Sequence, residues 1–141
     1  MVNDSLRTRP TKPLSRRESP MLDEPPIDLV HLARQCQGVE GLEEELLDLF
    51  RRLAGAEAAR LSDPSMELEQ KANAAHKLRG SALAVGAGRV ARAAQEVEAL
   101  PRAPSGAAPS AEQTAAAWRA IEALQTTVAE AIAEIERLRA G

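Results

Sequence analysis

The stretch AHKLRGSALAVGAGRVARAAQEVE, from Ala75 to Glu98, combines alanine-rich helical sequence with three glycines. Alanine is the best helix former, whereas glycine inside a helix costs about 1 kcal/mol relative to alanine. Gly86 and Gly88 lie close together and predict a tight turn between two helices. Gly80 falls inside the first of these helices, four residues after His76. It therefore leaves a position without a side chain one turn from an imidazole ring.

The composition around this stretch favours an all-α fold. The 141 residues suffice for one domain with a modest core, and the only aromatic residues are Phe50 and Trp118. Apolar residues recur at helical spacing, and strand-like alternation is absent. We therefore expect helices over about 27–37, 41–61, 63–85 and 89–100, followed by a last and longest helix that begins near Ser110.

The expected helix ends and faces suggest how these segments pack. Asp63 before Pro64 is typical of an N-cap followed by a proline at the first helical position. Ser110 and Gln113 fit a capping box, and Trp118 is expected in the core. Each helix is apolar on one side only, so the helices must bury those faces against one another. The sequence thus predicts an antiparallel four-helix bundle with a short additional N-terminal helix.

The N-terminal segment differs from the rest of the chain. Residues 1–26 contain five of the nine prolines, and residues 1–20 carry a net charge of +3, against −6 for the remainder. We expect 1–26 to be a disordered, weakly basic tail and 27–141 to be the helical domain. The tail could act as an electrostatic arm, but a simple extension before a start at Met21 fits its composition better.

Several classes of protein are disfavoured by the composition. The formal net charge of −3 gives no overall basic surface for nucleic acid. Cys36 is the only cysteine, so neither an internal disulfide nor a cysteine-rich zinc site is expected. His31 has no metal-ligand spacing to His76 and is expected to be a surface histidine. No apolar run approaches the roughly 18 residues of a membrane span, and the chain does not begin with a secretory signal. We expect a cytoplasmic protein without a metal site of its own.

The surroundings of His76 suit phosphoryl transfer. A helical projection places the ring at the edge of the solvent face, with Arg79 and Gly80 on the same side. Imidazole is substantially neutral near pH 7, and its free nitrogen can act as a nucleophile. The guanidinium group of Arg79 can bind an anion, and the missing side chain at Gly80 lets another surface come close to the ring. By spacing alone, an ordinary surface histidine with a chance glycine is an equally good interpretation.

The same stretch resembles the signature of histidine-containing phosphotransfer (HPt) domains, in which a helix bears His-x-Leu-Lys-Gly-Ser/Ala and a glycine turn follows. The resemblance covers about 27–138, and its specific part is confined to 75–98. The matching positions are Ala75, His76, Leu78, Gly80, Ser81, Val85, Gly86, Val90 and Glu98.

This resemblance implies roles for individual residues. His76 would be the phosphorylated residue, and Arg79 stands where the family has a lysine, so the charge is kept but the phosphate geometry could differ. Glu98, with Gln95 one turn before it, would take the place of a polar residue beside the imidazole. A carboxylate there would fix the ring tautomer and leave the other nitrogen free. A solvated carboxylate at the helix end is the alternative for Glu98.

The resemblance also implies partners and a reaction. The protein would accept a phosphoryl group from a receiver domain or a hybrid histidine kinase and pass it to another receiver aspartate, as a monomeric carrier and not an enzyme. Mg²⁺ would belong to the receiver only, so the chain itself would need no cofactor. Leu83 and Ala87 could contact the receiver or pack in the core. The alternatives are a helical interaction module without phosphotransfer and a last helix that forms a coiled-coil dimer.

Overall fold

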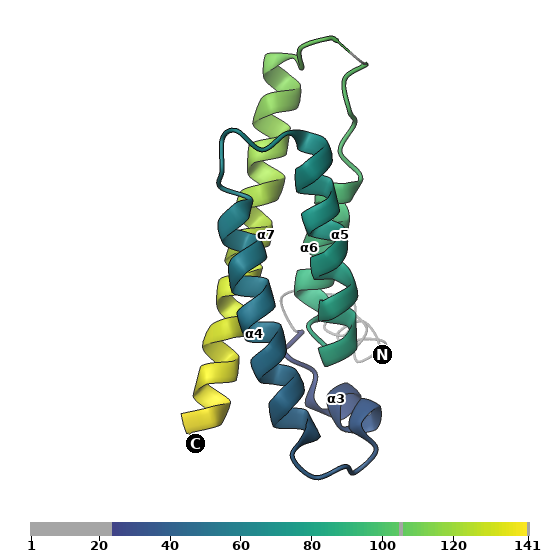
Figure 1. The fold of residues 1–141 in the computed structure, drawn as a ribbon, viewed down its shortest axis with the longest axis vertical. Helices are drawn as coiled ribbons and strands as arrows, with labels where there is room; N and C mark the ends of the chain where they lie inside the picture. The colour runs from purple at the N-terminus through teal and green to yellow at the C-terminus, as the bar shows by residue number, and fades with distance from the viewer. Residues whose placement is uncertain (1–23, 105, 141) are drawn as a thin grey trace, which may run out of the picture.

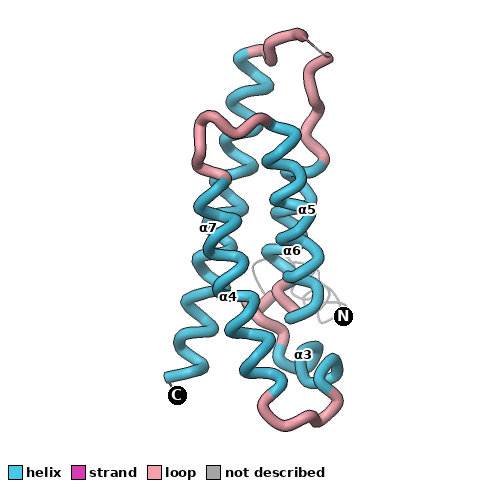
Figure 2. The backbone as a smooth tube through the Cα atoms, in the orientation of Figure 1, coloured by secondary structure: helices cyan, strands magenta, loops and turns pink. Residues whose placement is uncertain are grey.

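The computed structural model describes residues 24–104 and 106–140, and these form helices and loops with no strand. The all-α prediction is confirmed (Figures 1 and 2). Residues 1–23 of the predicted tail lie outside the described residues. The helices are α3 (Leu29–Cys36), α4 (Leu42–Arg60), α5 (Leu68–Val85), α6 (Gly88–Glu98) and α7 (Ala111–Ala140).

The four longer helices lie side by side along the long axis of the molecule (Figure 1). Helix α5 contacts α4 and α6, and α7 contacts the same two helices, so the four surround a common interior. The short helix α3 lies at the lower end in Figure 1, against α4 and α5. With 30 residues, α7 is the longest of the described helices, as predicted.

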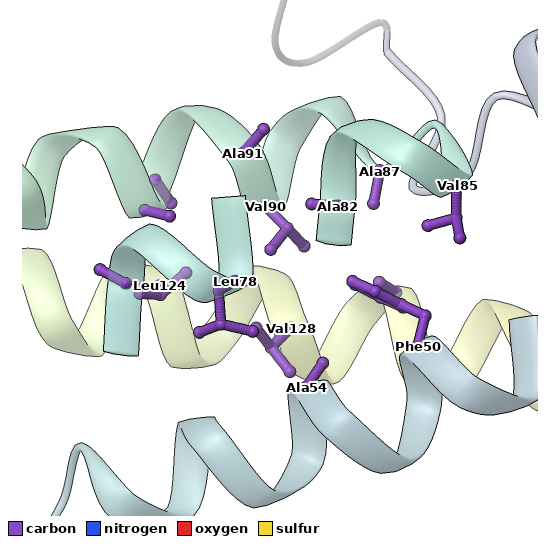
Figure 3. Packing of buried hydrophobic residues seen from close by; sticks show 14 of the residues in the cluster. Phe50, Ala54, Leu78, Ala82, Val85, Ala87, Val90, Ala91, Leu124 and Val128 are labelled. Carbon is purple, nitrogen blue, oxygen red and sulfur yellow. The ribbon is translucent and has the colours of Figure 1, made fainter. Parts of the chain in front are cut away.

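The interior is filled by small and medium aliphatic side chains from all four helices (Figure 3). Because many of these residues are alanines, the helix backbones can approach closely, and larger side chains fill the remaining space. Residues of this core that Figure 3 labels include Phe50 and Ala54 of α4, Leu78 and Ala82 of α5, Val90 of α6, and Leu124 and Val128 of α7.

One of the two expected helix starts is confirmed and the other is wrong. At α7 the Gln113 N–H donates to Ser110 Oγ at 3.0 Å, and the Ser110 N–H donates to Gln113 Oε1 at 2.9 Å. Asp63 does not cap α5, because its carboxylate accepts from the N–H and the hydroxyl of Ser65 in a local turn. Helix α5 begins later, with a capping box between Glu67 and Gln70.

Trp118 is not a core residue, contrary to expectation. It is 47% exposed, and its ring centroid lies 4.8 Å from the Lys71 ammonium group. Lys71 is buried and donates to the carbonyls of Leu61, at 2.8 Å, and Asp63, at 3.2 Å. Desolvation by burial lowers the pKa of Lys71. The tryptophan therefore covers a buried cation that ties α5 to the end of α4.

The turn between α5 and α6 determines how these two helices meet. Gly86 ends α5 with φ +81°, the left-handed conformation that glycine adopts without penalty. A Cβ at this position would lie 2.8 Å from the backbone oxygen of Asp28. The Asp28 N–H donates to the Gly86 carbonyl at 2.9 Å. The predicted glycine turn is confirmed, and the entry to α3 packs directly upon it.

His31 adds a second connection between α3 and α5. Its ring is partly buried, and Nε2 lies 2.8 Å from the carbonyl oxygen of Leu83. A ring nitrogen that carries a proton donates to a carbonyl at this distance. His31 is therefore a half-buried structural residue and not simply the surface histidine that the sequence suggested.

Candidate functional site

His76, Arg79 and Glu98 form one cluster between α5 and the last residue of α6. The His76 Nδ1 atom lies 3.2 Å from Glu98 Oε1. Arg79 reaches the same carboxylate, with its Nε 2.7 Å from Oε2 and its Nη2 3.4 Å from Oε1. The side chain of His76 is 70% exposed, that of Glu98 only 21%. Three of the residues singled out in the sequence are thus in direct contact, and the imidazole faces solvent.

The contacts of Nδ1 bear on the position of the ring proton. Nδ1 also lies 3.3 Å from Arg79 Nη2, which can only donate. A protonated Nδ1 donates to Glu98, and Arg79 then directs its own protons to the same carboxylate. An unprotonated Nδ1 would instead put the ring proton on Nε2, which has no hydrogen-bond partner in 24–104 or 106–140. The first arrangement satisfies more groups, and it leaves a lone pair on the exposed Nε2.

The charge of Glu98 is maintained by its neighbours. Burial favours the neutral carboxyl group, but the hydrogen bonds from Arg79 and His76 outweigh it, so the pKa of Glu98 is lowered. The same contact with Glu98 raises the pKa of Arg79. The cluster therefore contains an ionised carboxylate and a guanidinium group beside the imidazole ring. The guanidinium fork is occupied by Glu98.

Gly80 lies on the exposed surface next to this cluster. A Cβ built at Gly80 would meet no other atom within 4 Å, so packing within the described chain does not require a glycine here. The exposed Leu83 follows on the same helix. Ala87, by contrast, is fully buried and belongs to the core. The surface beside His76 is thus free of obstruction along the following turn of α5.

Gln95 is not part of the cluster. It is exposed on α6, and its side chain makes no hydrogen bond to any described residue. The expected contact between Gln95 and the imidazole of His76 is therefore absent from the described residues.

Charged residues that the sequence reasoning did not single out flank the cluster. Arg102 donates to the backbone oxygen of Glu98 at 3.4 Å and pairs with Glu69 of α5 at 3.3 Å. Lys77, next to His76 in sequence, pairs with the buried Glu57 of α4 at 3.4 Å. Glu69 precedes His76 by seven residues, a spacing that places both on one helix face. Arg102 lies in a loop and gave no such signal.

Within residues 24–104 and 106–140, no group of three or more His, Cys, Asp or Glu side chains could hold a metal ion. None of the helices in this part of the chain is long and apolar enough to cross a membrane.

Comparison with known proteins adds one match. A family model described as the Hpt domain matches residues 37–141, which include α4 to α7 and the whole cluster around His76. No curated protein and no solved structure matches the chain.

Proposed function

We propose that this chain, which belongs to the Hpt domain family, carries a phosphoryl group on His76 in a bacterial multistep phosphorelay. Hpt domains are phosphocarriers that work with receiver domains and histidine kinases and do not themselves act as kinases. The finer assignment to His76 rests on the site geometry. The proposal includes an antiparallel four-helix bundle with an additional N-terminal helix, supported by the mutual contacts of α4 to α7.

The observation that carries the proposal is the exposed imidazole whose Nδ1 meets a carboxylate. With the proton on Nδ1, the Nε2 lone pair can attack the phosphorus of an aspartyl phosphate on a receiver domain. A bond forms between Nε2 and phosphorus, the bond between phosphorus and the aspartyl oxygen breaks, and the receiver carboxylate leaves with the electron pair. The reverse reaction delivers the phosphoryl group to the next receiver.

The neighbouring residues have separate roles in this proposal. Glu98 orients the ring and holds its proton, Arg79 contacts that carboxylate, and Gly80 permits close approach of the receiver. Gln95, exposed one turn before Glu98, is assigned to contact with the partner. Mg²⁺ is assigned to the receiver, so the carrier needs no cofactor. We place this exchange in the cytoplasm and assign it to a monomer.

A transfer assay tests the proposal directly. A receiver domain carrying a labelled aspartyl phosphate is mixed with the wild-type chain, with His76→Gln and with His31→Gln. We expect acid-labile label on the wild type and on His31→Gln, and none on His76→Gln. Equal labelling of all three would contradict the assignment to His76. Receiver binding without any labelling would favour an interaction module instead.

A further inference from the structure

The side chains around His76 balance one another's charges, and what this means for a bound phosphoryl group rests on the proposed function. The neutral ring, the Glu98 carboxylate and the Arg79 guanidinium group have a net charge of zero. Arg79 contacts Glu98 at 2.7 Å and approaches the ring on its Nδ1 side, at 3.3 Å. The attacking nitrogen is Nε2, on the other side of the ring. The guanidinium group is therefore engaged away from the position that the phosphoryl group would take.

The other cations close to the cluster also have carboxylate partners. Lys77 pairs with Glu57, which in addition accepts from Arg60, and Arg102 pairs with Glu69. In the described part of the chain, the side chains around His76 thus offer no cation that is without an acidic partner. A phosphoryl group on Nε2 would have to compete with these carboxylates for positive charge.

We infer that Arg79 is a positioning residue that holds Glu98 in place, and that the charge-neutral cluster makes phospho-His76 a short-lived carrier which releases its phosphoryl group readily. This role differs from that of a clamp on the phosphoryl group. Arg79 acts on the reaction through Glu98, and Glu98 acts through the Nδ1 proton.

The chemistry of release gives this arrangement a direct consequence. After phosphorylation, the ring bears the phosphoryl group on Nε2 and a proton on Nδ1, and it carries a positive charge. The Glu98 carboxylate accepts a charge-assisted hydrogen bond from Nδ1–H and so keeps the proton on the ring while the phosphoryl group is bound. When the acceptor oxygen attacks phosphorus, the electrons of the phosphorus–nitrogen bond return to Nε2. The ring then leaves as neutral imidazole, which is a better leaving group than an imidazolate anion.

The first experiment measures the lifetime of phospho-His76 without any partner protein. Potassium phosphoramidate serves as the donor: its phosphorus–nitrogen bond breaks, ammonia leaves, and phosphorus bonds to Nε2. After removal of the donor, ³¹P NMR follows the loss of the phosphohistidine signal. Glu98→Gln keeps an oxygen that can accept from Nδ1 but removes the charge and releases Arg79. Without the carboxylate, the phosphorylated ring loses its Nδ1 proton more readily and would then have to leave as imidazolate, so we expect the lifetime to increase about fivefold.

Glu96→Gln is the matched control, because Glu96 is exposed on the same helix and changes the net charge equally without touching the cluster. Its lifetime should equal that of the wild type. A wild type that gains no phosphate on His76 would overturn the proposed function. Phosphorylation with equal or shorter lifetime in Glu98→Gln would overturn this inference and leave the proposed function standing.

The second experiment tests the positioning role in the unphosphorylated protein. The ¹⁵N shifts of the His76 ring, measured where the ring is neutral, report which nitrogen holds the proton. We expect the Nδ1–H tautomer to dominate in the wild type. The ratio of Nδ1–H to Nε2–H should fall severalfold in Arg79→Gln, and Arg79→Lys should restore part of that ratio. A residue that acted only on the phosphoryl group would leave these shifts unchanged. Unchanged shifts in a variant with native thermal unfolding would therefore overturn the positioning role.

Discussion

Gly80 and Gly86 lie six residues apart at the end of the same helix, yet the structure uses them for opposite purposes. Gly86 has φ +81° and no room for a side chain against Asp28. Gly80 has helical geometry and open space where its Cβ would be. One end of α5 is thus closed by packing with α3, and the surface beside His76 is open. The difference indicates that Gly86 serves the fold, whereas no contact among the described residues requires a glycine at position 80.

The two histidines repeat this contrast. His31 meets a backbone carbonyl at the closed end. His76 meets a carboxylate and is 70% exposed at the open surface. A histidine bound to a carbonyl fastens two elements together, whereas one held by a carboxylate keeps a nitrogen available for chemistry. The neighbourhood, and not the residue type, distinguishes the two histidines.

The strongest test of the closed end is Gly86→Ala. We expect a loss of about 2 to 3 kcal/mol in the free energy of unfolding, because alanine is strained at positive φ and its Cβ would press on the Asp28 backbone. Urea denaturation measures the change. A loss well under 1 kcal/mol would mean that α3 does not hold the turn in the way described.

A smaller effect is expected from His31→Ala. Removal of the hydrogen bond to the Leu83 carbonyl should cost about 1 kcal/mol of unfolding free energy. His76→Ala is the control, and it should change stability by less than about 0.5 kcal/mol because its ring is exposed. Equal losses of unfolding free energy for the two variants would contradict the distinction between the closed end of α5 and the open surface beside His76.

Gly80→Ala should change stability in the opposite direction to Gly86→Ala. Alanine in an exposed helix interior is favoured over glycine, so we expect a gain of about 0.5 to 1 kcal/mol in denaturation experiments. Transfer from a phosphorylated receiver should nevertheless slow, while phosphorylation by phosphoramidate should not. If both donors react as fast as with the wild type, Gly80 does not serve the approach of a partner.

The smallest effect concerns pH. Because the pKa of Glu98 is lowered in the folded chain, the stability that its charge contributes is fully present above the ordinary pKa of a glutamate and is lost as the pH falls through the lowered pKa. At pH 7 the free energy of unfolding of the wild type should exceed that of Glu98→Gln by less than about 1 kcal/mol. This difference should shrink towards pH 3. Urea denaturation across this range checks the sign, and a difference that grows on acidification would contradict it.

The local features of the fold were predictable because their causes lie within a few residues. The Ser110–Gln113 capping box and the glycine turn at Gly86 both follow from chain-local chemistry. The start of α5 was misjudged because Asp63 satisfies its own turn and leaves the capping to Glu67. Trp118 was misplaced because its neighbour Lys71 is 47 residues away in sequence, and helical periodicity does not report such a contact.

By itself, the sequence determined that this chain is helical and that His76, Arg79 and Gly80 share one face of a helix, since three- and four-residue spacing is enough to align side chains. Only the tertiary structure decided that Arg79 pairs with Glu98, that Gln95 stands apart and that Ala87 is buried. Those facts depend on how α5 and α6 face each other across the turn at Gly86. Pairing between charges depends on distances between helices, which the packing of the whole bundle sets.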